Sequence, residues 1–538
     1  MVLNKKCLIT SKNSLYKSSK DVDIYYIEDY TGFGNVKEAS ILTDKIYKSN
    51  PNFIQKYDYE GYKVTWSWYD QVYQKCLHYT QIKDLLMKLE SLNYKVIEIH
   101  EIYPPYERIF NHYFFNKKIK TRRGNNIQNN IKQFIINILL LLFTIISMGY
   151  FFFRNKKAIG IRTEDMIFKG TSSDFRLNHL YDKLNVKKTN YIEFIRTKSL
   201  YTFFKNTFIR RRFAIYYDSI TYFASLLTKK SVSLTPTSFY EAVLFSTSFS
   251  NEVLINSIKY IEKILKICKI DKIIILSFSS RTALISIAAK SLNIKTIGIM
   301  HGLSIKEQMA YEFMDSYTED KKIGPDIYGV WSNDWVKYFH NYCKITLAKN
   351  IVHSGLLRPL DKFSQKPFSP ISKYKIKVLI ISEPLVSVQE MLPFLSKIIE
   401  CDDFEVGIKI RPMIKDCYYE ELKRVYPKIL ECPKYDGKIF DDGEKFDVFI
   451  GSYSTAVIEA SLMSKLSILI RTEKWEDYFG MTSLLDNFNL LIDSPENICS
   501  EIKHRVKNED KFNTINQIRT KFFGDNKDGV DWIIKELI

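Results

Sequence analysis

The sequence predicts an α/β protein with two Rossmann-like parallel-sheet domains that face a cleft, and three observations support this fold class. From about residue 235, short apolar runs alternate with amphipathic stretches of helical length. A stretch over 358–373, rich in proline, serine and lysine, interrupts this alternation. The alternation then restarts and continues to about residue 471. Alternating strands and helices favour parallel sheets, which bind ligands at the carboxyl ends of their strands.

The elements expected from these runs follow one another closely. Before the interruption they are a helix ending at Cys268, strands over 273–277, 294–300 and 326–331, helices from Thr282 and Asp334, and a short strand ending at His353. After it they are strands over 375–382, 404–410, 446–450 and 466–471, with helices from Val388, Asp416 and Thr455. The first half shows a helix over 79–92, strands over 95–100 and 190–196, and a turn at 174–177. Some βα structure is therefore expected there too.

The 538 residues are expected to form two or three domains. We expect an N-terminal α/β part over 1–130, an apolar helix over 131–157, the remainder of an N-terminal domain over 158–357 and a C-terminal domain over 374–538. A composition of 46% hydrophobic and 26% charged residues is typical of globular proteins and argues against a disordered chain or a multi-span carrier.

The formal net charge of +18 favours anionic partners, namely nucleotides, phospholipid head groups or nucleic acid. No nucleic-acid reader motif is found in the sequence, so we expect no nucleic-acid partner. The eight cysteines include no CxxC pair and are interpreted as reduced thiols. No apolar run of signal-peptide length occurs in the first twenty residues. We therefore expect a cytoplasmic location.

Residues 134–153 carry no charge and are long enough to cross a bilayer as a helix. Ten basic residues flank them: Lys117, Lys118, Lys120, Arg122, Arg123 and Lys132 before, and Arg154, Lys156, Lys157 and Arg162 after. A transmembrane span and a buried core helix are the alternatives to a helix that dips into an anionic membrane surface. The flanking charges weakly favour an orientation that would separate the C-terminal half from cytoplasmic nucleotides. We therefore prefer the dipping helix, at the cytoplasmic face of the inner membrane.

The strongest motif runs from Asp447 to Glu459, where an apolar strand ends in a small polar turn that opens a helix. Ser452, Ser454 and Thr455 can hold a phosphate there, since a helix N-terminus presents unpaired amides. A plain N-cap is the alternative. Glu459, one turn into the helix, is placed to accept hydrogen bonds from ribose hydroxyls.

Two further strand ends carry residues that suit transfer chemistry. Arg411, before Pro412, can clamp phosphate oxygens through its guanidinium fork, with a surface arginine as the alternative. His301 precedes Gly302 and can accept a proton from a hydroxyl nucleophile, with a structural histidine as the alternative. Gly302 and Gly451 relax the two loops on which these groups lie.

The order of strand-His-Gly, strand-Arg-Pro and strand-Gly-Ser-Tyr-Ser-Thr-helix-Glu resembles a GT-B glycosyltransferase over residues 235–490. More narrowly it is similar to the bacterial surface-polysaccharide and teichoic-acid group. That group includes CDP-glycerol glycerophosphotransferases and the CMP-sugar transferases for sialic acid or Kdo.

The resemblance implies a base at His301, with matches also at Gly302 and Lys306. It equates Ser454-Thr455 with the family's Ser-Ser or Ser-Thr turn. Where the family has His-Pro, this chain has Arg411-Pro412, which keeps a phosphate contact but cannot transfer a proton. The resemblance also implies no metal and no cofactor, with a CMP-, CDP- or UDP-linked donor as the substrate.

The function expected is transfer of a glycosyl or glycerophosphate-type group from a nucleotide-activated donor to a cell-surface polysaccharide or lipid-linked acceptor. A non-catalytic scaffold protein of the same fold and a sugar-nucleotide epimerase are the alternatives. If His301 is not the base, Glu164, Asp165 and Asp174 are the remaining candidates, because they flank the turn-rich stretch after the apolar segment.

Overall fold

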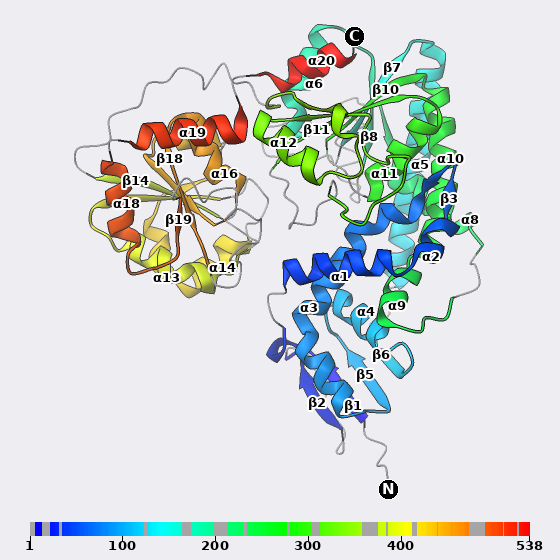
Figure 1. The fold of residues 1–538 in the computed structure, drawn as a ribbon, viewed down its shortest axis with the longest axis horizontal. Helices are drawn as coiled ribbons and strands as arrows, with labels where there is room; N and C mark the ends of the chain where they lie inside the picture. Colours follow the sequence, from blue (N-terminus) through cyan, green and yellow to red (C-terminus); the bar gives the residue numbers. More distant parts are fainter. Residues whose placement is uncertain are drawn as a thin grey trace.

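The computed structural model describes three α/β bodies, each built on its own parallel sheet (Figure 1). The described residues are 6–12, 22–31, 35–122, 127–163, 174–196, 213–229, 234–276, 280–302, 313–357, 375–382, 386–410, 417–437, 439–452, 454–472, 490–508, 510–524 and 527–537. In Figure 1 the N-terminal body lies at the bottom, the seven-stranded body at the upper right and the six-stranded body at the left. The α/β class and the two predicted parallel sheets are confirmed.

The seven-stranded sheet has the order β13-β12-β11-β10-β7-β8-β9. Its strands are β7 (Ala158–Thr163), β8 (Tyr191–Ile195), β9 (Ala214–Tyr216), β10 (Ile270–Ile275), β11 (Lys295–Ile299), β12 (Ile327–Val330) and β13 (Ile351–His353). Its helices are α6 (Asn178–Val186), α8 (Tyr217–Leu227), α10 (Ser248–Ile267), α11 (Ser280–Ser291) and α12 (Asn333–Tyr342), whereas α9 (Phe239–Phe245) packs against the helices of the N-terminal body. The chain builds outward from β7 to β9, returns to β10 beside β7, and then builds outward to β13. The topological switch point, where open α/β sheets bind ligands, therefore lies between β7 and β10.

The six-stranded sheet has the order β16-β15-β14-β17-β18-β19. Its strands are β14 (Ile376–Ile381), β15 (Phe404–Lys409), β16 (Lys434–Tyr435), β17 (Val448–Gly451), β18 (Leu466–Ile470) and β19 (Leu491–Ile492). Its helices are α13 (Val388–Ile399), α14 (Cys417–Val425), α15 (Ile439–Gly443), α16 (Thr455–Ile458) and α18 (Ile498–Lys507). A capping box between Ser387 and Glu390 starts α13. Here the switch point lies between β14 and β17.

The N-terminal body is a third α/β unit, within the N-terminal α/β part expected over 1–130. Its parallel sheet has the order β2-β1-β5-β6. The strands are β1 (Lys6–Thr10), β2 (Asp23–Tyr26), β5 (Val96–His100) and β6 (Lys118–Arg122). The helices are α1 (Val36–Lys48), α2 (Pro51–Lys56), the 3-10 helix η2 (Val64–Trp68), α3 (Tyr69–Ser91) and α4 (Pro104–Tyr113). The helix predicted over 79–92 is thus the second part of the longer α3, which is kinked at Ile82.

The apolar segment forms one helix, α5 (Ile127–Arg154), and its length and composition are sufficient to cross a membrane. α5 packs along β9 and α8. On the side that packs inward, Thr144 accepts a hydrogen bond from the Tyr216 backbone N–H (3.1 Å) and Ser147 is fully buried. α5 therefore covers the edge of the seven-stranded sheet, which would otherwise present unpaired backbone groups.

The C-terminal end of the chain returns to the seven-stranded body, so the predicted boundary of 374–538 needs correction. After α19 (Lys511–Phe523), helix α20 (Gly529–Leu537) packs over α6, as Figure 1 shows at the top. Lys183 on α6 pairs with Asp528 just before α20 (2.9 Å). Ile533 joins a core cluster with β7. Apolar side chains on α20 thus belong to the other domain's core.

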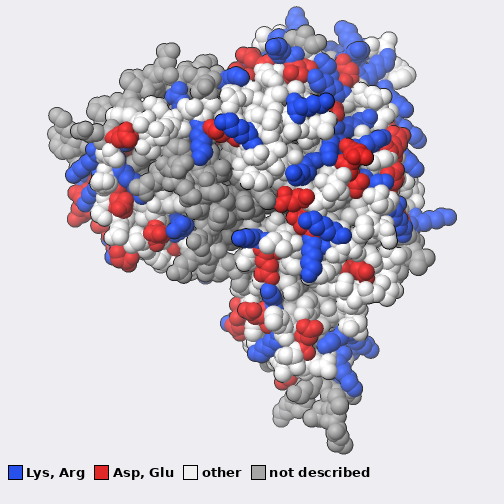
Figure 2. All heavy atoms as spheres, viewed as in Figure 1, with Lys and Arg blue, Asp and Glu red and all other residues white. Residues whose placement is uncertain are grey.

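Charged side chains of both signs cover the face viewed in Figure 2, where Lys and Arg are dispersed among Asp and Glu. On the described part of that face, the lysines and arginines do not gather into one continuous groove. On this face the described charges are therefore of mixed sign.

Candidate functional site

His301 lies at the carboxyl end of β11, and its ring reaches the switch point of the seven-stranded sheet. The ring Nδ1 is 3.1 Å from the carbonyl oxygen of Leu276, which follows β10. A carbonyl only accepts hydrogen bonds, so Nδ1 carries the proton in this contact. The nitrogen able to accept a proton from a substrate is then Nε2.

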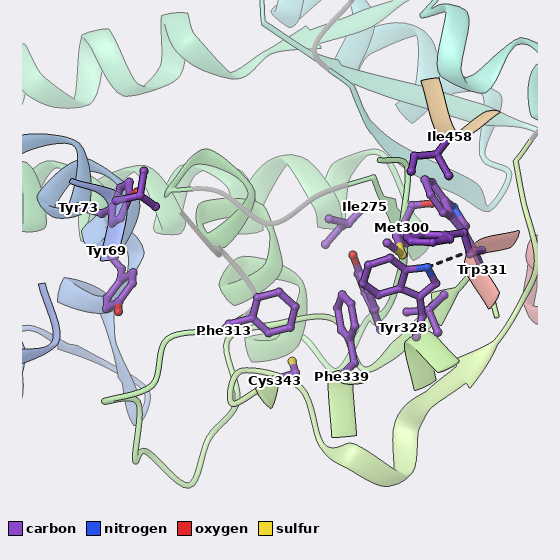
Figure 3. Packing of buried hydrophobic residues seen from close by; sticks show 14 of the residues in the cluster. Tyr69, Tyr73, Ile275, Met300, Phe313, Tyr328, Trp331, Phe339, Cys343 and Ile458 are labelled. Carbon is purple, nitrogen blue, oxygen red and sulfur yellow. Dashed lines mark hydrogen bonds between the residues drawn. The ribbon is translucent and has the colours of Figure 1, made fainter. Parts of the chain in front are cut away.

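The residue before His301 is held from two sides. The Met300 backbone N–H donates to the carbonyl oxygen of Gly329 (2.9 Å), and the Trp331 indole Nε1–H donates to the carbonyl oxygen of Met300 (2.8 Å; Figure 3). Among the described residues, no atom would lie within 4 Å of a Cβ placed on Gly302. The backbone that carries His301 is thus anchored by two hydrogen bonds, as a positioned base requires.

The polar turn after β17 lies at the switch point of the six-stranded sheet. Ser454 is the N-cap of α16, and its hydroxyl oxygen accepts a long hydrogen bond from the Ala456 N–H (3.4 Å). Ser454 and Thr455 are partly buried. α16 has only four residues before it tightens into the 3-10 helix η7 (Glu459–Met463). The site therefore offers a few amides and hydroxyls and little helix dipole.

Ser452 and Gly451 in this turn have structural roles. Ser452 is fully buried, and its hydroxyl donates to the carbonyl oxygen of Ile470 at the end of β18 (3.1 Å). Its predicted phosphate contact is corrected on this ground, because the hydroxyl joins two strand ends. A Cβ on Gly451 would lie 2.8 Å from Val457, so this glycine allows β17 and α16 to pack closely. Glu459 is buried at the start of η7, and its ribose contact stays a prediction.

The six-stranded and seven-stranded bodies join through a shared apolar core. The Trp335 indole on α12 donates to the carbonyl oxygen of Phe522 on α19 (2.9 Å). Figure 3 shows Ile458, the last residue of α16, among the side chains around Met300 and Trp331. The same core therefore supports the loop that carries His301 and the helix that follows Ser454.

Of the remaining predicted site residues, the structure describes only Asp174. Arg411, Glu164 and Asp165 lie outside the described residues. Asp174 is fully buried and forms a bidentate pair with Arg176 (2.6 and 2.9 Å). Burial alone would raise the pKa of the Asp174 carboxyl, but the hydrogen bonds and charge of Arg176 outweigh it and lower that pKa. Asp174 is therefore a poor general base, which corrects its candidacy.

Sequence reasoning missed several charged groups at the carboxyl edges of the sheets. Arg162, at the end of β7, is 4% exposed and its guanidinium lies 5.2 Å from the Tyr217 ring centroid. Arg196, after β8, pairs with Asp218 at the start of α8 (3.5 Å). In the other domain the Lys409 ammonium donates to the carbonyl oxygen of Gly437 (2.7 Å). Each cation is at or next to the end of an apolar run, and this position was the available signal.

No protein-family model matches the chain, and no curated relative was found by sequence. Similar solved structures include UDP-GlcNAc 2-epimerase from Neisseria meningitidis bound to UDP-GlcNAc, with a TM-score of 0.45 and 11% identity over 71% of this chain and 99% of that one. A glycosyltransferase from Rickettsia africae has a TM-score of 0.43 and 13% identity over 71% of this chain and 98% of that one. MurG from Acinetobacter baumannii has a TM-score of 0.40 and 7% identity over the same shares of the two chains. At such TM-scores, the functional argument has to come from the chain's own residues.

Proposed function

We propose that this chain is a GT-B-type glycosyltransferase that moves a sugar from a nucleotide-activated donor to a surface-polysaccharide or lipid-linked acceptor. One observation carries the proposal: the His301 ring hydrogen-bonds to the carboxyl end of β10, beside the switch point of one parallel sheet, and the Ser454-Thr455 turn lies at the switch point of the other. Switch points are the usual ligand positions of such sheets, and here the two are supported by one core.

The residues at the two switch points divide the reaction between them. His301 Nε2 takes the proton of the acceptor hydroxyl as its oxygen bonds to the anomeric carbon. The bond from that carbon to the donor phosphate breaks, and its electron pair leaves with the nucleotide. Amides and hydroxyls at Ser454 and Thr455 bind the phosphate as its charge develops. The sequence motif adds Arg411 as a phosphate clamp, and no step requires a metal ion.

Thermal unfolding in the presence of nucleotides tests the donor assignment. A nucleotide that binds the native state raises the unfolding temperature by mass action. We expect CMP, CDP or UDP to stabilise the full-length chain more than GDP does. Release of the nucleotide from a sugar-linked donor, seen only when a lipid-linked acceptor is added, would then separate a transferase from a scaffold protein or an epimerase. Absence of stabilisation by every nucleotide would refute the proposal.

The outer face of α5 supports a location on the membrane. Its outward side chains are large and apolar, with Ile146 59% and Phe153 84% exposed. Lys132, Arg154, Lys156 and Lys157 are exposed at its ends. An apolar stripe between basic ends fits a surface of anionic lipid.

The packing of α5 favours a helix lying in the membrane surface over a span. Its inner side is fixed to β9 through the Thr144 hydroxyl and to α8 by side-chain packing. A span would draw this sheet edge into hydrocarbon together with the helix. The proposed location is therefore the cytoplasmic face of the inner membrane, with the acceptor-side domain against the lipid.

A further inference from the structure

A cavity of about 360 Å³ lies between α5, α8, α10 and the end of η2. α8 begins directly after β9, so the cavity opens at the carboxyl edge of the seven-stranded sheet. The residues that line it come from all four elements: Trp68, Gln133, Asn137, Asp218, Thr221, Tyr222, Ser225, Phe249, Ser250, Val253 and Leu254. Its position beside α5 distinguishes it from the switch-point site.

The polar side chains of this cavity offer mainly hydrogen-bond acceptors. The Thr221 hydroxyl donates its proton to the Tyr217 carbonyl oxygen (2.7 Å), and the Ser225 hydroxyl donates to that of Tyr222 (2.6 Å). The Asn137 amide likewise donates to the backbone of its own helix. Because these donors are already used, the oxygens can accept hydrogen bonds from a ligand.

The Trp68 indole adds a buried donor to these acceptors. The indole Nε1–H of Trp68 is buried and has no acceptor among the residues that the structure describes. A buried donor without a partner is costly, so a ligand oxygen that accepts from it gains binding energy. Among the lining residues there is no lysine or arginine, which argues against a phosphate or carboxylate ligand. Aromatic side chains together with hydrogen-bond acceptors and donors suit a neutral polyhydroxylated ligand.

The cavity adjoins the apolar face of α5. Phe134, which is 42% exposed on that face, has its ring 6.5 Å from the ring of the lining residue Tyr222. A ligand with a polar head and an apolar tail can therefore place the head in the cavity and the tail beside Phe134. We propose that this cavity binds a neutral sugar unit of a membrane-held glycolipid. That this glycolipid is the acceptor rests on the proposed function.

Titration calorimetry with two probes of equal chain length, each kept monomeric, tests the cavity. We expect octyl β-glucoside to bind the full-length chain and octyl phosphate to bind more weakly. Trp68→Phe keeps the ring but removes the N–H, so it should weaken glucoside binding about fivefold, which corresponds to one hydrogen bond. Glucoside binding by Trp68→Phe equal to that of the unchanged chain would overturn the proposal, as would tighter binding of octyl phosphate.

A matched pair of serines on α8 provides the control. Ser225 and Ser219 each donate to a carbonyl oxygen three residues earlier (2.6 Å), but only Ser225 lines the cavity. Ser225→Ala should weaken glucoside binding and Ser219→Ala should leave it unchanged, and equal effects would contradict a sugar site. Nucleotide stabilisation should be unaffected in all variants. Glucoside binding without nucleotide stabilisation would refute the transferase and leave the cavity assignment standing.

Discussion

The two switch points differ in the chemistry of the residues around them. At the edge of the seven-stranded sheet, charges are buried and paired, as in Asp174 with Arg176, and an imidazole is held by a carbonyl oxygen. At the edge of the six-stranded sheet, the turn presents the hydroxyls of Ser454 and Thr455. The buried Lys409 nearby also has a counter-ion, Asp442 (3.5 Å), and it donates to the carbonyl oxygen of Gly437 (2.7 Å). The first edge suits proton transfer, and the second suits binding of a phosphate by neutral donors.

This difference suits separate roles for the two domains in the proposed reaction. Neutral amides and hydroxyls can bind the phosphate of the leaving nucleotide without the free-energy cost of removing water from a cation. Fixed ion pairs hold side chains in one geometry beside a base. Helix α5, with its exposed apolar side chains, packs on the seven-stranded domain, and the cavity lies beside it. On the proposed function, the acceptor would bind to the seven-stranded domain and the donor to the six-stranded domain, and four sets of changes test this.

The largest effect is expected at His301. If Nε2 takes the acceptor proton, His301→Ala should lower the transfer rate by roughly 10²–10⁴-fold while nucleotide affinity stays unchanged. The rate is measured as nucleotide released in the presence of acceptor, and affinity as thermal stabilisation by nucleotide. A loss of nucleotide affinity would break the assignment of this edge to the acceptor.

His301→Gln separates a base from a positioning residue. Glutamine can still hydrogen-bond to a hydroxyl but cannot take its proton. A base therefore requires the Gln variant to be nearly as inactive as the Ala variant. Substantial activity in the Gln variant would end the assignment of His301 as the base.

The second effect concerns the stability of the charged edge. Asp174→Asn leaves Arg176, which is 10% exposed, without its counter-ion and should lower the free energy of unfolding by about 3 kcal/mol. Replacing both partners, as Asp174→Leu with Arg176→Met, should restore much of this loss. Urea unfolding of the three proteins measures the difference. Equal stabilities would show that the pair does not organise this edge.

The same pair gives the chain a pH dependence of known sign. The folded-state pKa of Asp174 is lowered, so the pair's contribution is fully present above the unfolded pKa of about 3.9 and is lost as pH falls through the folded value. Below about pH 4, the unchanged chain should lose stability more steeply than Asp174→Asn does. If the free energy of unfolding fell equally steeply with pH in both proteins below about pH 4, the lowered pKa of Asp174 would be contradicted.

The third effect sharpens the contrast between the domains at the membrane. Ile146→Ser with Phe153→Ser should weaken sedimentation with phosphatidylglycerol vesicles about tenfold or more, since each side chain contributes roughly 1 kcal/mol of apolar burial. Leu430→Ser, on the six-stranded domain and 63% exposed, is the matched control and should not change binding. Persistent sedimentation of the double variant would assign the anchor to the basic surface instead of α5. Deleting 134–153 is a poorer test, because it would also uncover β9.

Much of the fold after residue 235 was predictable from the alternation of apolar runs. The turn after β17 and the histidine after β11 were located correctly, because glycine and small polar residues end their strands. β7 was missed, because its apolar run comes only a few residues after the apolar stretch of 134–153. The packing of α20 on the seven-stranded domain was not predictable. An amphipathic pattern shows that one face of a helix is buried, but it does not show against which domain that face packs.

The roles of individual side chains were less predictable than their positions. Ser452 and Ser454 look alike in the sequence, yet one hydroxyl joins two strands and the other caps a helix. Asp174 and Arg176 are two residues apart, and their pairing depends on the geometry of a turn. The composition of the segment does not reveal that geometry. Local pattern located the ends of the strands, and tertiary packing decided how the side chains there are used.

The smallest effect is expected at the donor edge, where Ser454→Ala with Thr455→Ala removes the two hydroxyls nearest the phosphate. The cap that Ser454 supplies is long, at 3.4 Å, so its loss should cost the fold no more than about 0.5–1 kcal/mol. Nucleotide affinity should fall roughly five- to thirtyfold, as expected for losing one or two hydrogen bonds of about 1 kcal/mol each. Ser452→Ala is the control, because its buried hydroxyl bonds to Ile470 and should affect stability more than affinity. If the double variant binds nucleotide as tightly as the unchanged chain, the phosphate does not lie at this turn, and the donor must be sought elsewhere on the six-stranded sheet.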